Sequence, residues 1–313
     1  MRVAVTGAGG FVGRALCRSL ADGRLSVTAC IRTGSAPQGA DREARIGDIT
    51  DRQALAVAFT GADAVVHLAG RAHVMRDDAA DPLAEYRRVN VEGTKAVCEA
   101  AAETGVRRIV FMSSVKVNGE RSQDRPLTED DPPCPEDPYG VTKMEAETAL
   151  FASAAERGFE AVCLRPPLVY GPGVRANFAA LMKLCDSGIP LPFGSVTGNR
   201  RSLIHVGNLV SAIETALTHE NAAGRVFLVR DGEDLSTAGL VRALRTAMGR
   251  PPRLLPVPVS LLNGLLRLAG RGAMAERLLG TLSVDDSAIR AALGWIPPVA
   301  VADAMAGTVA ARQ

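Results

Sequence analysis

The stretch MRVAVTGAGGFVG, residues 1–13, decides the fold of this chain. Its apolar run at residues 3–5 is typical of a strand that is buried on both faces. Glycines break the run, and apolar residues then resume with helical spacing. Gly7 permits a tight turn, Gly10 lets a phosphate approach the backbone, and Gly13 lets the helix pack closely on the strand. A strand, a glycine-rich turn and a helix in this order predict a dinucleotide-binding unit.

Apolar strand patterns and helical patterns alternate through the first half of the chain. The alternation predicts an α/β Rossmann fold, a doubly wound parallel sheet with ligands at the carboxyl ends of its strands. We expect a cofactor-binding domain over residues 1–169, with a return segment at about residues 204–230. A smaller C-terminal substrate-binding lobe is expected over residues 170–203 and 231–313. The strand patterns lie at residues 26–31, 44–46, 64–68, 108–112, 159–164 and 227–229.

Composition narrows the functional classes. The net charge of +2 offers no basic footprint for nucleic acid. Six scattered cysteines and four dispersed histidines predict reduced thiols in a cytoplasmic protein without a metal site. We expect no integral membrane segment, because no apolar run is long enough to span a bilayer. Residues 254–268 are interrupted by prolines and Arg267, which favours a turn and a packed helix and leaves contact with a membrane surface open.

A tyrosine and a lysine are spaced for acid–base chemistry. Tyr139 and Lys143 are four residues apart at the start of a helical pattern, so they share a helix face. A nearby ammonium favours the phenolate and is expected to lower the pKa of the tyrosine. Ser114 follows the strand pattern at residues 108–112, where the tyrosine could meet it over a substrate. His67 is expected to be a core or loop residue rather than a catalyst.

Six motifs together carry a family resemblance: TGAGGFVG (6–13), DI (48–49), HLAG (67–70), NVEGT (90–94), SSVKVNG (113–119) and YGVTK (139–143). In their order and spacing the chain resembles the extended short-chain dehydrogenase/reductase family, over nearly its whole length. Within it the chain is most similar to nucleotide-sugar epimerases and 4-ketoreductases. The resemblance implies that Ser114, Tyr139 and Lys143 form the catalytic triad. Tyr139 would exchange the proton of a sugar hydroxyl while a hydride moves between that carbon and nicotinamide.

The resemblance also implies binding residues. Lys143 would hold the nicotinamide ribose, and Ser114 the reacting oxygen. Asn90 either supports the site through a helix distortion or a bound water, or is structural. The full set expected at the cofactor is Gly7, Gly10, Phe11, Val12, Arg32, Asp48, Ile49, Leu68, Ala69, Gly70, Asn90, Tyr139, Lys143 and Pro166.

Substrate contacts are expected from three residues. Arg201 aligns with an arginine that holds the diphosphate in nucleotide-sugar enzymes, and a guanidinium fork suits phosphate oxygens. Asn177 is placed for the uracil or the diphosphate. Lys116 points to the same side as Ser114 if the strand continues, and either contacts the substrate or lies in solvent. Arg277 is a candidate for a second phosphate-binding arginine.

Two departures from the family pattern bear on the reaction. The 4,6-dehydratases of the family carry an acidic pair where this chain has Val115 and Lys116. Removal of water needs a base for the C5 proton, so a dehydratase is not expected. Asn118 stands where many epimerases have tyrosine, with no consequence that the sequence reveals.

The expected reaction is NAD(P)-dependent oxidation or reduction at C4 of a UDP-sugar. SSVKVNGE, RAHVMRD and RPPLVYGPG favour reduction of a UDP-4-keto-6-deoxy-N-acetylhexosamine for surface polysaccharides. The alternative is a UDP-glucose or UDP-N-acetylglucosamine 4-epimerase. Remoter alternatives are a ketone reductase of a non-sugar substrate, which the diphosphate-binding Arg201 argues against, and an NAD(P)-sensing regulator, which commonly loses the tyrosine or lysine that this chain keeps.

The second strand pattern ends without an acidic residue. Arg32 follows it, and Arg14 lies just after the glycine turn. A carboxylate there would repel a 2′-phosphate, whereas arginines attract it, so NADP(H) is expected in preference to NAD(H). Extended family members often dimerise through two helices, which here begin near Val91 and Tyr139, so a homodimer is expected.

Overall fold

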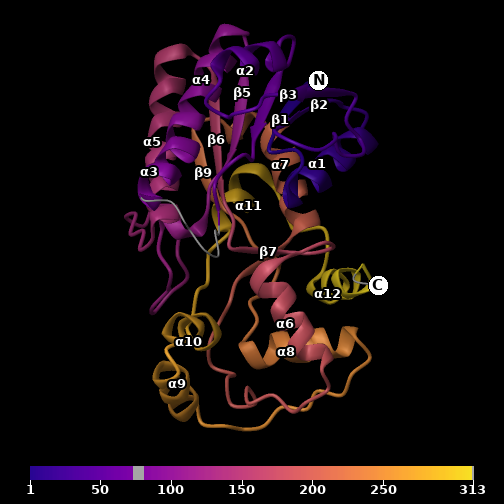
Figure 1. Ribbon diagram of the computed structural model, residues 1–313, viewed down its shortest axis with the longest axis vertical. Helices are drawn as coiled ribbons and strands as arrows, with labels where there is room; N and C mark the ends of the chain where they lie inside the picture. The colour runs from indigo at the N-terminus through magenta and orange to yellow at the C-terminus, as the bar shows by residue number, and fades with distance from the viewer. Residues whose placement is uncertain (73–80, 312–313) are drawn as a thin grey trace.

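The computed structural model describes residues 1–72 and 81–311. Within them, seven parallel strands form one sheet in the order β3-β2-β1-β4-β5-β6-β9 (Figure 1). This arrangement confirms the predicted doubly wound fold. Most boundaries agree with the apolar runs to within two residues. The strands are β1 (Arg2–Thr6), β2 (Ser26–Ile31), β3 (Arg42–Arg45), β4 (Ala64–His67), β5 (Arg108–Met112), β6 (Glu160–Arg165) and β9 (Arg225–Leu228).

Helices cover both faces of this sheet (Figure 1). Alternate residues of one strand point to opposite faces, so Val3 and Val5 join one core while Ala4 joins the other. Because both faces are covered, the central strands are apolar throughout. The first core lies under α1 (Phe11–Asp22), α7 (Val206–Thr218) and α11 (Ser287–Leu293), and the second under α2 (Arg52–Phe59), α4 (Gly93–Glu103) and α5 (Pro138–Arg157).

The helical pattern that begins at Asp81 is not one continuous α-helix. The Asp81 carboxylate caps α3 (Pro82–Arg87), and a π-helical turn at Arg88–Glu92 then separates α3 from α4. An extra residue in one turn rotates the side chains that follow it, and such turns are frequent at functional sites. Asn90 lies in this turn.

The second half of the chain adds a separate apolar core below the sheet (Figure 1). It packs around Tyr170, Phe178, Leu244 and Met305, which are all buried. Helix α11 instead shares the core beside β9 and α7. The predicted domain limits stay a prediction. The elements around the second core are β7 (Leu168–Tyr170), α6 (Ala176–Asp186), β8 (Leu203–His205), α8 (Thr237–Ala247), α9 (Val259–Leu268), α10 (Gly272–Leu279) and α12 (Val301–Ala310).

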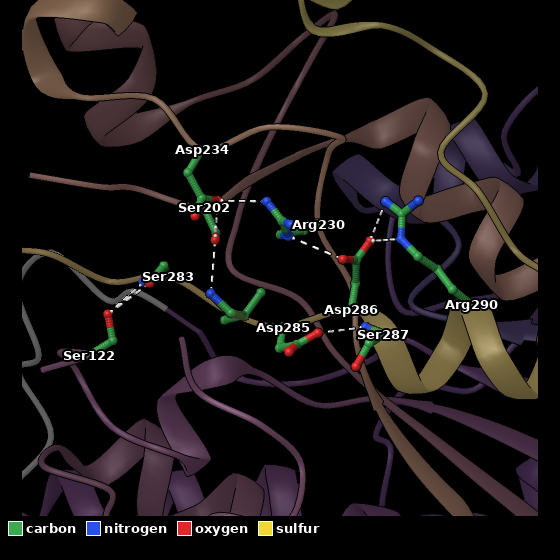
Figure 2. A network of polar contacts seen from close by, with 10 residues as sticks. Ser122, Ser202, Arg230, Asp234, Ser283, Asp285, Asp286, Ser287 and Arg290 are labelled. Carbon is green, nitrogen blue, oxygen red and sulfur yellow. Dashed lines mark hydrogen bonds and ion pairs between the residues drawn. The ribbon is translucent and has the colours of Figure 1, made fainter. Parts of the chain in front are cut away.

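A polar network ties the segments between the two cores together (Figure 2). The Ser283 N–H donates to Ser122 Oγ at 2.9 Å, which joins the C-terminal segment to the loop after β5. The Ser202 hydroxyl donates to Asp234 Oδ1 at 2.6 Å. Arg230 then bridges Asp234 and Asp286, with 3.2 Å contacts to each. These bonds hold the backbone on either side of Arg201 against the loop that follows Ser114.

A buried ion pair fixes α5 on β6. Arg165 donates to both carboxylate oxygens of Glu147, at 2.9 and 2.5 Å, and both side chains are nearly inaccessible. The third Arg165 contact is to Asn118 Oδ1 at 3.0 Å. Asn118 Nδ2 also donates to the Thr128 carbonyl at 2.8 Å. The departure at Asn118 thus has a structural explanation: its amide completes the coordination of a buried guanidinium and anchors the loop after β5.

The Glu147–Arg165 pair should dominate the stability of α5. Glu147→Ala leaves a buried guanidinium without its counter-charge, which costs about 3–5 kcal/mol. Glu145→Ala is the matched control on α5. It removes an exposed ion pair between Glu145 and Arg87 of α3, which is worth about 0–1 kcal/mol. Urea denaturation of both variants measures the two losses. Equal losses would contradict the structural role assigned to Glu147.

Candidate active site

The glycine turn forms a cradle that side chains would fill. Gly7 has a φ of +68°, and a Cβ there would lie 2.7 Å from the Ala69 backbone nitrogen. A Cβ at Gly13 would clash with the Gly7 carbonyl. Helix α1 begins after Gly10 with no side-chain cap and no acidic residue in its first turn. The N–H groups of that turn, at Phe11 and Val12, can therefore bind an anion, so the turn fits the pyrophosphate of a dinucleotide.

His67, at the end of β4, contacts β1 and α4 through its two ring nitrogens and is buried. Its Nδ1 is 2.8 Å from Thr6 Oγ1, and its Nε2 is 3.1 Å from Thr94 Oγ1. Burial, together with repulsion from Lys143, lowers the pKa of His67 to about 3. The imidazole is therefore neutral near pH 7 and is hydrogen-bonded at both ring nitrogens, as is typical of a histidine in a protein core.

Tyr139 and Ser114 meet at the carboxyl end of β5. Pro138 opens α5, and the Asp137 carboxylate caps it by accepting from the Gly140 N–H at 2.7 Å. This start places the phenol of Tyr139 in a hydrogen bond with the Ser114 hydroxyl. Burial raises the pKa of Tyr139 to about 12, although the bond to Ser114 opposes the shift. The expected lowering of the Tyr139 pKa by Lys143 is therefore wrong for this structure, because burial raises this pKa and repulsion from the Asp137 carboxylate adds to the rise.

Lys143 lies one helical turn after Tyr139 and is fully enclosed. Its Nζ donates to the Met112 carbonyl at 2.7 Å and lies 4.4 Å from the centre of the Phe111 ring. Burial lowers the pKa of Lys143 to about 8, against the attraction of Cys163 and Glu147. A Cβ at Gly70 would lie 3.3 Å from Nζ. Lys143 thus faces the loop Leu68–Gly70, which the sequence places at the cofactor.

Asn90 connects that loop to α5 through the π-helical turn. Its Oδ1 accepts from the Arg71 N–H at 2.7 Å, and its Nδ2 donates to Thr142 Oγ1 at 3.0 Å. Thr142 immediately precedes Lys143. The helix distortion expected at Asn90 is present, and the side chain positions two segments of the site.

Lys116 is engaged by carboxylates of its own loop. Its Nζ donates to Glu120 at 2.6 Å and to Asp137 at 2.5 Å. Although burial by itself would lower the pKa of Lys116, these two hydrogen bonds raise it. The contact to Asp137 couples this loop to the cap of α5, two residues before Tyr139. Asp137 is thus a positioning residue that sequence reasoning missed, although an Asp-Pro pair before a helix signals such a cap.

Arg201 lies within electrostatic range of Glu120, in the loop that follows Ser114. Burial lowers the pKa of Arg201, and its charge also interacts with Glu120, Glu276 and Arg277. The charge of Arg277, a candidate on sequence grounds, repels that of Arg201 and adds to the lowering of the Arg201 pKa. Guanidinium groups suit phosphate oxygens, so Arg201 stays the main candidate for a diphosphate contact.

The remaining predicted residues lie in other parts of the fold, except Pro166, which is bonded to the residue after Ser114. Arg32 is exposed at the end of β2, while Arg14 Nε donates to the Gly9 carbonyl at 2.8 Å within the glycine turn. Asp48 pairs with Arg88 at 2.8 Å, and Ile49 packs against Gly93 of α4. Pro166 is buried after β6, and its carbonyl accepts from the Val115 N–H at 3.0 Å. Asn177 is exposed in the first turn of α6.

Two absences hold for the described part of the chain. No group of histidine, cysteine or acidic side chains there could hold a metal ion. None of its helices has the length and apolar character needed to cross a membrane. Residues 73–77 of the RAHVMRD motif lie outside the described residues.

The opposite shifts at the two site lysines can be measured together. The chain has only four lysines, so ¹³C-methylated lysine NMR resolves each titration. We expect one resonance to titrate near pH about 8 and to vanish in Lys143→Met, because burial disfavours the charged form of Lys143. The Lys116 resonance should titrate above the ordinary lysine range and shift downward in Asp137→Asn. A Lys143 resonance that loses its proton no earlier than Lys116 would contradict the enclosed geometry.

Comparison with known proteins identifies the family of the chain. Residues 3–229 match the NAD dependent epimerase/dehydratase family. A UDP-glucose 4-epimerase of Vibrio cholerae is 43% identical over 306 residues, which are 95% of this chain and 90% of that protein. An N-acetyl-alpha-D-glucosaminyl-diphospho-ditrans,octacis-undecaprenol 4-epimerase of Escherichia coli O157:H7 is 33% identical, over 84% of this chain and 77% of its own.

A solved structure extends the similarity to the whole fold. The UDP-glucose 4-epimerase of Thermus thermophilus in complex with NAD is 26% identical and superposes with a TM-score of 0.77, covering 99% of this chain and 98% of its own. The chain therefore belongs to the NAD dependent epimerase/dehydratase family, the extended short-chain dehydrogenase/reductase enzymes that its motifs resemble.

Proposed function

We propose that the protein is a 4-epimerase of a UDP-linked hexose or N-acetylhexosamine that works with NAD. The observation that carries this proposal is the enclosed Ser114–Tyr139 pair at the end of β5, with Lys143 one helical turn away. The similarity to a UDP-glucose 4-epimerase over nearly the whole chain supports it. The same similarity favours epimerisation over 4-keto reduction, which the sequence motifs alone had favoured.

The residues of the site divide the work of the reaction. Bound NAD would supply the acceptor and donor for the hydrogen at C4. In its phenolate form Tyr139 would accept the proton of the 4-hydroxyl and later return it, while the Ser114 hydroxyl would hold the same oxygen. Ser114 is buried and Tyr139 is partly buried, which limits the access of water to the transferred proton. Lys143, buried beside the Leu68–Gly70 loop, would hold the ribose hydroxyls of the dinucleotide.

The surroundings of Ser114 oppose a dehydratase. Elimination across C5 and C6 needs a carboxylate next to the reacting oxygen, and the residues that follow Ser114 are Val115 and Lys116. The nearest carboxylates, Glu120 and Asp137, are bound by Lys116. The site thus has an acid–base group for C4 but no free base after Ser114 for C5.

The cofactor proposal departs from the sequence expectation. NAD is bound in the related Thermus thermophilus epimerase, and a structure of MoeE5 that is 26% identical to this chain also contains NAD, with UDP-glucose. These relatives do not support a preference for NADP(H). Arg32 remains exposed at the end of β2 without an acidic neighbour there. We propose NAD as a resident cofactor, because epimerisation regenerates the same oxidation state in each cycle.

We also propose a homodimer formed through α4 and α5. These helices pack against each other on one face of the sheet. The outer surface of α5 carries the small or apolar side chains of Met144, Ala149 and Ala152, flanked by the exposed Arg87–Glu145 pair. Two copies of this face would bury a four-helix contact with ion pairs at its rim.

Tyr139→Phe tests the reaction and the acid–base assignment together. Wild-type protein should interconvert a UDP-sugar with its C4 epimer, UDP-glucose with UDP-galactose or the N-acetyl pair, without added nucleotide, and should release NAD on denaturation. Tyr139→Phe should lower turnover by about 10²–10⁴-fold, because only the transferable proton is lost. Tyr86→Phe is the matched control, a buried ring 6.4 Å from that of Tyr139. Net reduction of a 4-keto sugar at the expense of added NADPH, with no resident NAD, would instead establish the reductase.

Adjacent arginines test the diphosphate site. Arg201→Met should raise the KM for the UDP-sugar by about 10-fold or more with little change in kcat, because a charge-assisted contact to phosphate is worth about 1.5–3 kcal/mol. Arg200→Met is the control, since Arg200 is exposed and its guanidinium donates to the carbonyls of Thr197 and Asn199. Equal KM values for the two variants would remove Arg201 from the substrate site.

A further inference from the structure

Helix α9 carries leucines on its outer face. Leu261, Leu265 and Leu268 follow the i, i+4, i+7 spacing of one helix face and are 54%, 55% and 88% exposed. Leu262 is buried on the inner side of the same helix. Exposed groups of large apolar side chains on a protein surface mark sites of interaction with a protein or a membrane. Among the described residues, nothing covers the outer side of α9.

The apolar surface extends beyond this helix. Leu255, in the segment that leads into α9, is 49% exposed, and Met274 on the neighbouring α10 is 43% exposed. Helices α9 and α10 pack together at the end of the molecule opposite α2 and α4 (Figure 1). We call these exposed residues the α9 patch: Leu255, Val259, Leu261, Leu265, Leu268 and Met274.

Positive side chains outnumber negative ones around the patch. Residues 235–275 contain six arginines and no aspartate or glutamate. Three of these arginines, Arg253, Arg267 and Arg271, are exposed within or beside the patch sequence. Glu276 is the first acidic residue after this stretch, and it already contacts Arg121 at 3.6 Å and Arg267 at 3.9 Å. The surface therefore combines exposed apolar side chains with a rim in which positive charge exceeds negative charge.

We propose that the α9 patch docks on the surface of a membrane that contains anionic phospholipids. The leucines would enter the boundary between headgroups and acyl chains, and the arginines would contact lipid phosphates, as in interfacial amphipathic helices. A second copy of the chain fits this surface less well, because symmetric pairing would bring the arginines of both copies together with too few acidic partners.

Docking there would hold the substrate lobe against the bilayer. The Arg121–Glu276 contact joins α10 to the loop after Ser114, and the charge of Arg277 on the same helix interacts with that of Arg201. Helix α10 thus carries both Met274 of the patch and the candidate phosphate residue Arg277. The inference does not depend on which sugar reacts, since it rests on the exposed side chains of α9 and on their charge surroundings.

Vesicle co-sedimentation tests the proposal directly. The full-length protein should bind vesicles of phosphatidylcholine with phosphatidylglycerol more tightly than phosphatidylcholine alone, and high salt should weaken this binding. Leu265→Glu with Leu268→Glu should lower the partition coefficient by about 10-fold or more, because each leucine loses its burial in lipid. Arg267→Gln with Arg271→Gln should lower it by about five-fold for each arginine on the anionic vesicles.

Matched controls separate docking from general surface effects. Val57→Glu and Ile296→Glu replace exposed apolar side chains elsewhere, 72% and 66% exposed, and should leave vesicle binding unchanged. Leu268→Trp should show a blue-shifted emission on adding anionic vesicles, since the single native Trp295 is already buried. Unchanged circular dichroism in every variant shows that the chain still folds.

Two outcomes would overturn the proposal. One is that wild-type protein binds neither kind of vesicle, or that the double glutamate variant binds as well as wild type. The other is that the double glutamate variant halves the molecular mass in solution while wild type ignores vesicles, which would assign the α9 patch to a second copy. Loss of epimerase activity in Tyr139→Phe bears on neither outcome, so failure of the catalytic proposal is distinguishable.

Discussion

Parallel pairing of the strands is the constraint on which the site depends. In register, Thr6 lies beside His67, and His67 lies beside Phe111. Strands paired in parallel end at one edge of the sheet, so the segments that follow them must share that edge. The glycine turn, the Leu68–Gly70 loop and Ser114 are these segments. They are distant in the sequence, and the pairing of their strands brings them together.

Helix α5 supplies the other half of the site through its spacing. Tyr139, Lys143 and Glu147 are separated by four residues each and therefore lie along one face. Glu147 binds Arg165 and fixes the helix on the sheet, while the first two side chains face the end of β5. The buried ion pair thus holds the catalytic face in register. A single helix combines structural anchoring with the residues of the proposed acid–base chemistry.

Burial sets the protonation of this face in opposite directions. Desolvation raises the pKa of Tyr139 and lowers that of Lys143, so both side chains move toward their neutral forms. Neutral groups carry little electrostatic cost in an enclosed site: the neutral phenol of Tyr139 can donate a proton, and the neutral amine of Lys143 can accept one. The second core leads away from this site to a surface of different character, where the α9 patch exposes leucines and its rim exposes arginines. Polar side chains are thus buried at the candidate active site, whereas apolar side chains are exposed on α9.

Local patterns in the sequence were enough to predict the sheet and most of its strand limits, because apolar periodicity and glycine spacing need no distant neighbour. The candidate triad was also named from a local pattern, Tyr-x-x-x-Lys. The tertiary structure alone decided what depends on distant neighbours. It decided that Lys116 binds Glu120 and Asp137, that Asn118 supports Arg165, and that the pKa of Tyr139 rises. Charges and amides in a loop find their partners outside their own sequence window, and desolvation depends on atoms from every element around a group. The outer face of α9 was likewise ambiguous, because its leucines repeat on both sides and only packing shows which side stays exposed.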